Sequence, residues 1–245
     1  MTYAYALWTL FLLLAWTIVL LGLRHRARRR KMLMSSFLTM PLGLTEPIFV
    51  PEYWNPPTPF DLAATTGFDL ESLGFSFAVG GLASTLYDRL HPAELTPLRS
   101  SHHDQPRHRW HRLAMLSPIM SFIVLYWLGW FNPIYSAILA LTVGGLSAAY
   151  CRPDLARRMM AGAGVFGLFY FGFFLTLVQS HPNYVEQVWN LDAVSGILLL
   201  GVPAEEILFA LALGFLWSSA YEHITWTGAL RIRRYGGPDG PSKRG

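Results

Sequence analysis

A scarcity of cysteine and of charge defines this chain before any motif does. The single cysteine, Cys151, excludes an intramolecular disulfide framework and any Cys-based metal site. Charged residues make up only 14% of the 245 residues, against about 25% in typical soluble domains. The longest polar stretch, 89–112, is too short for a separate soluble domain. These absences indicate an integral membrane protein.

Basic residues are also missing from whole segments, and their absence orients the chain. The segments 51–69, around 132 and 181–192 contain no Lys or Arg. Cytoplasmic loops of membrane proteins carry the excess of these residues, so we expect the N-terminus outside and the C-terminus in the cytoplasm. The net charge of +4 does not indicate nucleic acid as a partner, because the arginines flank apolar runs and suit anionic lipid headgroups better. All 19 Lys and Arg residues fall in four segments: 24–31, 89–112, 152–158 and 231–244.

Long apolar runs predict the spans themselves. Hydrophobic residues make up 53% of the chain, and mostly apolar runs of about 18 residues or more predict membrane spans. The second run is interrupted by Pro41, Glu46 and Pro47, so it could be a broken or re-entrant piece. Many Trp residues, Trp54 and Trp189 among them, lie near run ends and suit interfacial belts. We expect seven spans, at 3–23, 32–50, 69–88, 113–130, 134–151, 159–179 and 195–221.

Two of these runs resemble each other. Residues 69–88 align without a gap on residues 203–222, an offset of 134. Both copies run from outside to inside, so a parallel repeat is expected. Glu71, Phe75, Ala78, Gly80, Leu82, Ser84 and Tyr87 are identical to Glu205, Phe209, Ala212, Gly214, Leu216, Ser218 and Tyr221.

The repeat predicts an all-α membrane fold with two parallel three-helix units and a linker helix between them (3+1+3). The first unit and its basic loop would occupy 1–112, the linker 113–130, the second unit 131–230 and a basic cytoplasmic tail 231–245. An odd number of linker spans is required for both units to point the same way, so the repeat and the charge distribution support each other.

Five carboxylates fall within or beside the expected spans. Charged groups in a membrane face the bundle interior or a wet cavity. Glu71 and Glu205 each begin a helix face with the spacing i, i+4, i+7 and i+11. Pro203 suits the start of a helix, whose first turn also favours acidic side chains. The candidates are Glu46, Asp69, Glu71, Glu205 and Glu206, although Glu71 could be a solvated acid at a span end, Glu46 a hinge and Asp69 an N-cap.

Two weaker signals indicate packing and solvent. Residues 162–167 match GxGxxG but lie in an apolar run without a preceding strand, so close helix packing is the better interpretation. A group of histidines in one basic loop fits no recognised metal motif and is expected to be solvated. These are His91, His102, His103, His108 and His111.

The segment 201–209 (GVPAEEILF) resembles the Pro-x-Glu-Glu-x-x-Phe signature of the lycopene cyclase domain family. This membrane family includes heterodimeric bacterial cyclases and fused archaeal and fungal forms, and its fused members are duplicated three-helix units. The chain departs from the family in its first copy, where Asp69 replaces Pro and Ser72 replaces the second Glu. The Pro-rich stretch 41–61 also differs from a typical cyclase N-terminal half.

The resemblance implies cyclisation of the ψ-ends of lycopene to β-ionone rings. An alkene is protonated, the carbocation closes the ring, and a proton is removed, so no redox cofactor and no metal are expected. Protonating an alkene requires a carboxylic acid that stays neutral, a state favoured by apolar burial and by a second carboxylate. Adjacent helix residues diverge by about 100°, and by the repeat the residue that faces the cavity is Glu205. We expect Glu205 as the acid, Glu206 as the neighbour that tunes it, Glu71 or Glu46 as the base, and Phe75, Phe209, Tyr87 and Tyr221 as the aromatic rings around the cation.

Two other classes of function remain open. Intramembrane carboxylates and proline-broken spans also suit a proton-coupled transporter of small solutes, although the Pro-Gln signature of one such 3+1+3 family is absent. The chain could instead be a non-catalytic partner of another carotenoid enzyme, in a homo- or hetero-oligomer. A cyclase needs an apolar cavity for a lipophilic polyene within the bilayer, whereas a carrier needs a polar site reachable from water.

Overall fold

The computed structural model describes residues 3–58, 62–91, 93–98 and 106–231. Within them, seven helices have at least 14 residues. These are α1 (Ala4–Gly22), α2 (Arg26–Thr39), α5 (Leu70–Leu90), α6 (His111–Leu128), α7 (Pro133–Cys151), α8 (Ala156–Ser180) and α10 (Ala204–Thr225). Shorter elements are α3 (Glu46–Phe49), α4 (Ala63–Thr66), α9 (Tyr184–Val188) and the 3-10 helices η1 (Met40–Thr45), η3 (Pro106–Trp110), η4 (Pro153–Leu155) and η5 (Leu191–Ala193).

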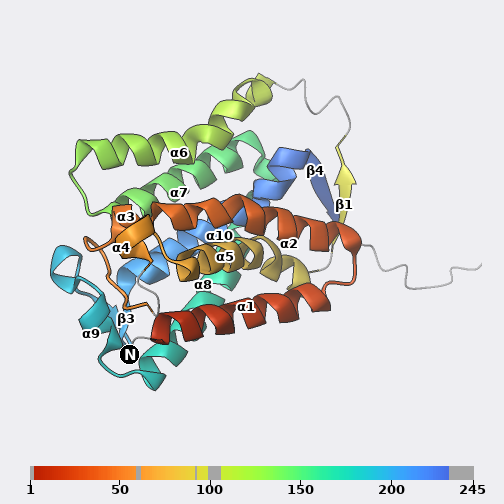
Figure 1. Cartoon of the computed structure of the whole chain (residues 1–245). Coiled ribbons are helices and arrows are strands. Elements are labelled where there is room, and N and C mark those ends of the chain that lie inside the picture. Colours follow the sequence, from red (N-terminus) through yellow and green to blue (C-terminus); the bar gives the residue numbers. More distant parts are fainter. Residues whose placement is uncertain (1–2, 59–61, 92, 99–105, 232–245) are drawn as a thin grey trace, which may run out of the picture.

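The long helices form one bundle with two distinct ends (Figure 1). One end, at the left of Figure 1, carries α3, α4, α9 and the N-terminus, and we call it the α9 end. The opposite end, which we call the β1–β4 end, carries a small sheet at the right. α10 is the central helix, with contacts to α5, α7 and α8, and α5 packs against α1 and α2. α6 lies outside this core against α7 and has no buried residue.

Five of the helices are long and apolar enough to cross a membrane within the described residues: α1, α6, α7, α8 and α10. The run 32–50 is not one of them, because α2 ends at Thr39 and the chain continues as η1 and α3 around Pro41 and Pro47. α5 covers the expected span 69–88, but Glu71, Asp88 and Arg89 make it less apolar than the five. The seventh helix begins at Ala204 and not at 195. The count of seven spans therefore stays a prediction.

Two short sheets depart from the all-α expectation. β1 (Ala93–Pro97) pairs antiparallel with β4 (Thr227–Arg231) at the end of the bundle, and β2 (Leu198–Leu199) pairs with β3 (Val202–Pro203). The β2–β3 hairpin occupies the segment that was expected to begin the last span. The expected basic tail lies outside the described residues from position 232 onward.

Local sequence signals explain where the helices begin and end. The Asn132 side chain accepts a hydrogen bond from the backbone N–H of Ile134 at 3.1 Å, and Pro133 fills the first helical position of α7. Pro203 directly precedes α10, as its position before two acids predicted. Gly129 ends α6 in a left-handed conformation (φ 63°), which glycine adopts at no steric cost.

Small residues allow the central helices to approach closely. The GxGxxG stretch lies within α8, and its interpretation as a packing motif is confirmed at Gly162, which faces Ser218 of α10. A Cβ atom added at Gly162 would lie 2.5 Å from the Cβ atom of Ser218, too close for α8 and α10 to keep their separation. Gly164 has no such neighbour within 4 Å.

A cluster of four buried charges lies among the central helices toward the β1–β4 end. The Nζ atom of Lys31 is 3.0 Å from Asp88 Oδ2 and 2.8 Å from Glu222 Oε1. Arg158 pairs with the same two carboxylates, at 2.9 Å from Glu222. Lys31, expected in a loop, is instead a fully buried residue of α2. The cluster joins α2, α5, α8 and α10 and balances two positive with two negative charges.

We predict that Lys31→Met destabilises the protein by about 3–5 kcal/mol, because it leaves a buried carboxylate without its cation. Adding Asp88→Asn removes the excess negative charge, so the double variant should lose less than the sum of the two single losses. Thermal unfolding in detergent micelles measures this. Exposed Arg30→Met is the control and should melt as the parent does. Additive losses would contradict the coupled cluster.

We predict that Gly162→Ala lowers the free energy of unfolding by about 1–3 kcal/mol, since its methyl group overpacks the α8–α10 contact. Gly164→Ala, in the same helix and with open space around it, should leave stability unchanged or raise it because alanine favours helix. The comparison of the two melting temperatures is the measurement. Equal effects would contradict the close approach.

Candidate active site

The first turn of α10 carries two adjacent carboxylates into the protein at the α9 end. Glu205 is 1% exposed and Glu206 is 7% exposed. Because successive residues of a helix diverge by about 100°, the two side chains meet different neighbours. Their chemical settings therefore have to be described separately.

Glu206 accepts three hydrogen bonds from neutral donors. Its Oε1 accepts from the Tyr53 hydroxyl at 2.8 Å and from the Trp189 indole N–H at 3.1 Å. Its Oε2 accepts from the Tyr170 hydroxyl at 2.6 Å. The donors come from three separate segments: the turn after α3, the middle of α8 and the residue after α9. This arrangement fixes the carboxyl group without a cation.

Glu206 also lines a cavity of about 150 Å³. Among the described residues, it is the one carboxylate in that lining. The walls come mainly from aromatic side chains of α1, α3, α5, α8 and α10 and of the segments beside them. The lining residues are Tyr5, Trp8, Thr9, Phe49, Tyr53, Trp54, Phe75, Ile134, Tyr170, Phe173, Phe174, Leu177, Trp189, Glu206 and Phe209.

Glu205 faces away from this cavity. Its Oε1 accepts hydrogen bonds from the Tyr135 hydroxyl at 2.6 Å and from the Ser195 backbone N–H at 3.0 Å. The sequence analysis expected Glu205 on the cavity, whereas the structure places Glu206 in the cavity lining. The repeat could not reveal this, because it aligns the two acids but not their tertiary neighbours.

Tyr53 is a buried residue of the turn after α3, so its ring sits away from water. Burial raises the pKa of the Tyr53 hydroxyl well above its ordinary value, and the neighbouring Glu206 carboxylate raises it further. The hydroxyl consequently keeps its proton at neutral pH and remains a donor to Glu206.

A second buried carboxylate, Glu46, lies near the cavity, with two hydroxyl groups between them. Glu46 is buried, and its Oε2 accepts a hydrogen bond from the backbone N–H of Asp69 at 2.6 Å. The Ser72 hydroxyl interacts with the Glu46 side chain and lies 2.9 Å from the Tyr5 hydroxyl. Tyr5 lines the cavity. Tyr5 and Ser72 are thus the hydroxyl groups between the cavity wall and Glu46.

The remaining acids of the first repeat copy play smaller parts. Glu71 is half-buried and is not a lining residue of the cavity. Asp69 stands at the N-cap position of α5, as expected, but its side chain makes no cap hydrogen bond there. Its Oδ1 instead accepts from the backbone N–H of Ala63 at 3.2 Å. The structure brings Glu46, Asp69 and Ser72 together and leaves Glu71 beside them.

The four expected aromatic residues divide into two pairs. Phe75 and Phe209 line the cavity from α5 and α10. Tyr87 and Tyr221 lie near the other ends of the same helices, and neither is a lining residue. Tyr87 stacks on His91, with ring centroids 4.7 Å apart. Both tyrosines lie outside the cavity lining because about three and a third helical turns separate them from Phe75 and Phe209.

The aromatic donors to Glu206 were missed by sequence reasoning. Trp189 and Trp54 were expected at membrane interfaces, but Trp189 is 6% exposed and both rings line the cavity. Tyr53 lies 153 positions before Glu206, so no local spacing connects them. The concentration of aromatic residues at 49–54 was the available signal.

Comparisons with known proteins bear on the second half of the chain. A family model described as lycopene cyclase matches residues 132–224. The match begins at the N-cap of α7, ends in the last turn of α10 and includes both Glu205 and Glu206. No curated protein and no solved structure matches the chain. The resemblance drawn from the GVPAEEILF segment is confirmed for residues 132–224, which are similar to the lycopene cyclase family.

Proposed function

We propose that this membrane protein is a carotenoid cyclase that converts the ψ-ends of lycopene to β-ionone rings by acid–base isomerisation. The observation that carries the proposal is the position of Glu206, a buried carboxyl group in the wall of an aromatic cavity, within a lycopene cyclase family domain. The lining supports a lipophilic polyene over a polar transported solute.

The cavity volume suits the end of a polyene and not its whole length. A cavity of about 150 Å³ holds a molecule the size of benzene, which has as many ring carbons as the ring that forms but lacks its methyl groups. The remainder of the polyene would then extend into the lipid that surrounds the exposed apolar helix faces. One end group enters at a time on this scheme.

Glu206 is the proposed acid, in place of Glu205. A tyrosine hydroxyl both donates and accepts hydrogen bonds, so Tyr53 or Tyr170 can rotate to accept from a protonated Glu206. The carboxyl group then passes its proton to the terminal alkene, and the resulting carbocation is attacked by the next double bond to close the ring. Apolar walls exclude water, which would otherwise trap the cation as an alcohol.

Aromatic faces would shield the cation during ring closure. A cation near an aromatic ring face is stabilised by about 0.5–2 kcal/mol, most where both are desolvated. Phe75 and Phe209 line the cavity from α5 and α10, and Trp8 and Phe174 line it from α1 and α8. This role is proposed for the walls as a group.

Glu46 is the proposed final acceptor of the proton that leaves the ring. The Tyr5 oxygen takes that proton while its own proton passes to Ser72 and from Ser72 to Glu46. One proton enters the substrate from Glu206 and one leaves toward Glu46, so the product is an isomer and no oxidant is consumed.

The 3+1+3 plan is proposed for the whole chain, with the N-terminus outside and the C-terminus in the cytoplasm. It is supported by the packing of α5 on α1 and α2, which parallels the packing of α10 on α7 and α8. The family match covers α7 to α10, which is the second unit of that plan. The cavity lies between the two units, with Tyr5 and Phe75 from the first and Tyr170 and Phe209 from the second.

We predict that Glu206→Gln lowers cyclisation by about 100-fold or more, the usual range for losing a general acid. Glu205→Gln should keep activity within a few-fold, because the amide oxygen can still accept from Tyr135 and Ser195. Pigments extracted from lycopene-accumulating bacterial cells are the measurement, with protein level in the membrane as the control.

The outcomes separate the alternatives. Unchanged lycopene with abundant parent protein would overturn the cyclase proposal and favour a carrier or a non-catalytic partner. An active Glu206→Gln variant beside an inactive Glu205→Gln variant would overturn the assignment of the acid while keeping the reaction.

We predict that Tyr5→Phe and Ser72→Ala each slow the reaction by about 10-fold or more. This loss is smaller than the rate contribution of a group that exchanges a proton with the substrate directly. Because both belong to one chain of hydroxyls, the double variant should be no slower than the slower single variant. Initial rates on lycopene in membranes measure this. Tyr184→Phe is the control, since this buried hydroxyl has no hydrogen-bond partner among the described residues and does not line the cavity. Multiplying losses would contradict the relay.

A further inference from the structure

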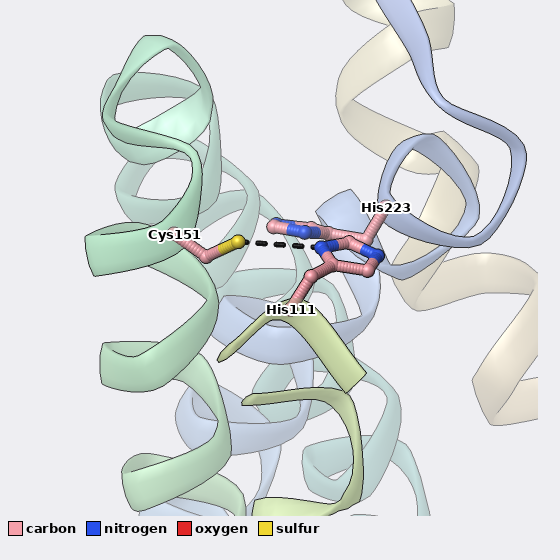
Figure 2. A group of neighbouring side chains, drawn as sticks. All are labelled: His111, Cys151 and His223. Carbon is pink, nitrogen blue, oxygen red and sulfur yellow. Dashed lines mark hydrogen bonds between the residues drawn. The ribbon is translucent and has the colours of Figure 1, made fainter. Parts of the chain in front are cut away.

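Three metal-binding side chains converge at the β1–β4 end, far along the bundle from the cavity. His111 begins α6, Cys151 ends α7, and His223 lies in the last turn of α10. One donor atom from each lies within 4.8 Å of the others. Figure 2 shows the Cys151 Sγ atom directed at the two imidazole rings, with a 3.2 Å contact to His111 Nδ1.

His223 gives an independent indication of a ligand. Its side chain is fully buried, and neither ring nitrogen has a hydrogen-bond partner among the described residues. The ring stacks on His111 with centroids 5.7 Å apart, which satisfies neither nitrogen. Burying an imidazole without partners costs about 1–3 kcal/mol per unsatisfied group, so a bound group that accepts a nitrogen lone pair would remove this cost.

We propose that His111, Cys151 and His223 bind a divalent ion of the Zn²⁺ class. Thiolate and imidazole are the ligands such borderline-soft ions prefer, whereas Ca²⁺ and Mg²⁺ require oxygen ligands, which this trio lacks. Three protein ligands leave a fourth position for water or another donor. The sequence analysis excluded a Cys-based metal site because the chain has one cysteine. One thiolate can nevertheless bind an ion together with imidazoles from distant segments, an arrangement that forms no sequence motif.

The surroundings fit a cation with a thiolate ligand. Arg152 lies next to Cys151, but Asp154 holds its guanidinium group with a 2.7 Å ion pair. His108 contacts the Cys151 carbonyl oxygen through Nε2 at 3.0 Å and so helps to fix the end of α7. His108 and His111 were expected in a solvated loop, but His108 is buried and His111 is half-buried.

The ion would act as a clip between three helices. α6 has no buried residue along its length, and His111 in its first turn contacts His223 and Trp226 through its ring. Ligands at the start of α6 and at the ends of α7 and α10 would tie that turn to the bundle. The site is independent of the cyclase proposal, because the cavity lies at the α9 end.

Titration of the full-length protein with Co²⁺ tests the site, using detergent-purified protein with a histidine-free affinity tag. The parent should bind one equivalent and show the thiolate-to-cobalt charge-transfer band, and Zn²⁺ should displace Co²⁺ and raise the melting temperature. Cys151→Ser should abolish the band. His223→Gln and His111→Gln each remove a direct ligand. They should weaken binding by more than the loss of a residue that only hydrogen-bonds to a ligand, which costs up to about 100-fold.

His25→Gln, which changes an exposed histidine of the same region, is the matched control and should bind as the parent does. The metal-free melting temperature of each variant establishes that it is folded. Absence of the charge-transfer band in the parent would overturn the proposal. So would metal binding that survives Cys151→Ser and His223→Gln unchanged, because the ion would then occupy another part of the chain.

Discussion

The bundle depends on neutralising charge away from water. Lys31, Asp88, Arg158 and Glu222 bring two positive and two negative charges together from four helices. An unpaired buried ion costs several kcal/mol, so sliding one helix against another would separate the paired charges at that cost. The cluster therefore fixes the register of α5 and α10 against α2 and α8. That same register sets Glu206, four and a half turns along α10, beside the donors from α8 and α9.

The two ends of the bundle treat charge in opposite ways. In the cluster near the β1–β4 end, each carboxylate has two cationic partners. At the α9 end, Glu46, Glu205 and Glu206 have only neutral donors among the described residues. A nearby cation favours the ionised form of a carboxylate. A hydroxyl group can donate to the carboxylate or accept from the protonated acid, so it permits both forms. The buried ion pairs thus lie at one end and the proposed proton chemistry at the other.

The sequence predicted the long apolar helices and the acid pair at the start of α10, because run length and Pro203 are local signals. It could not predict which acid faces the cavity. Glu205 and Glu206 are neighbours, and the choice between them depends on Tyr53 and Tyr170, which only the tertiary fold brings near. The expected loop position of Lys31 was wrong for the same reason. A basic run beside an apolar one predicts a loop, and the distant carboxylates that stabilise the Lys31 charge inside a helix leave no local pattern.

The departure of the first copy from the family signature acquires a physical meaning in this arrangement. In the alignment of the two copies, Ser72 occupies the position of Glu206. A glutamate there would add a third carboxylate beside Glu46 and Asp69, and their mutual repulsion would favour trapping a proton among them. Serine instead lies beside Tyr5 and Glu46, and in the proposed relay it would pass protons without holding charge. An isomerisation that adds a proton at one carbon and removes one at another needs two unlike groups. A duplicated unit can supply them once one copy has exchanged its acid for a hydroxyl.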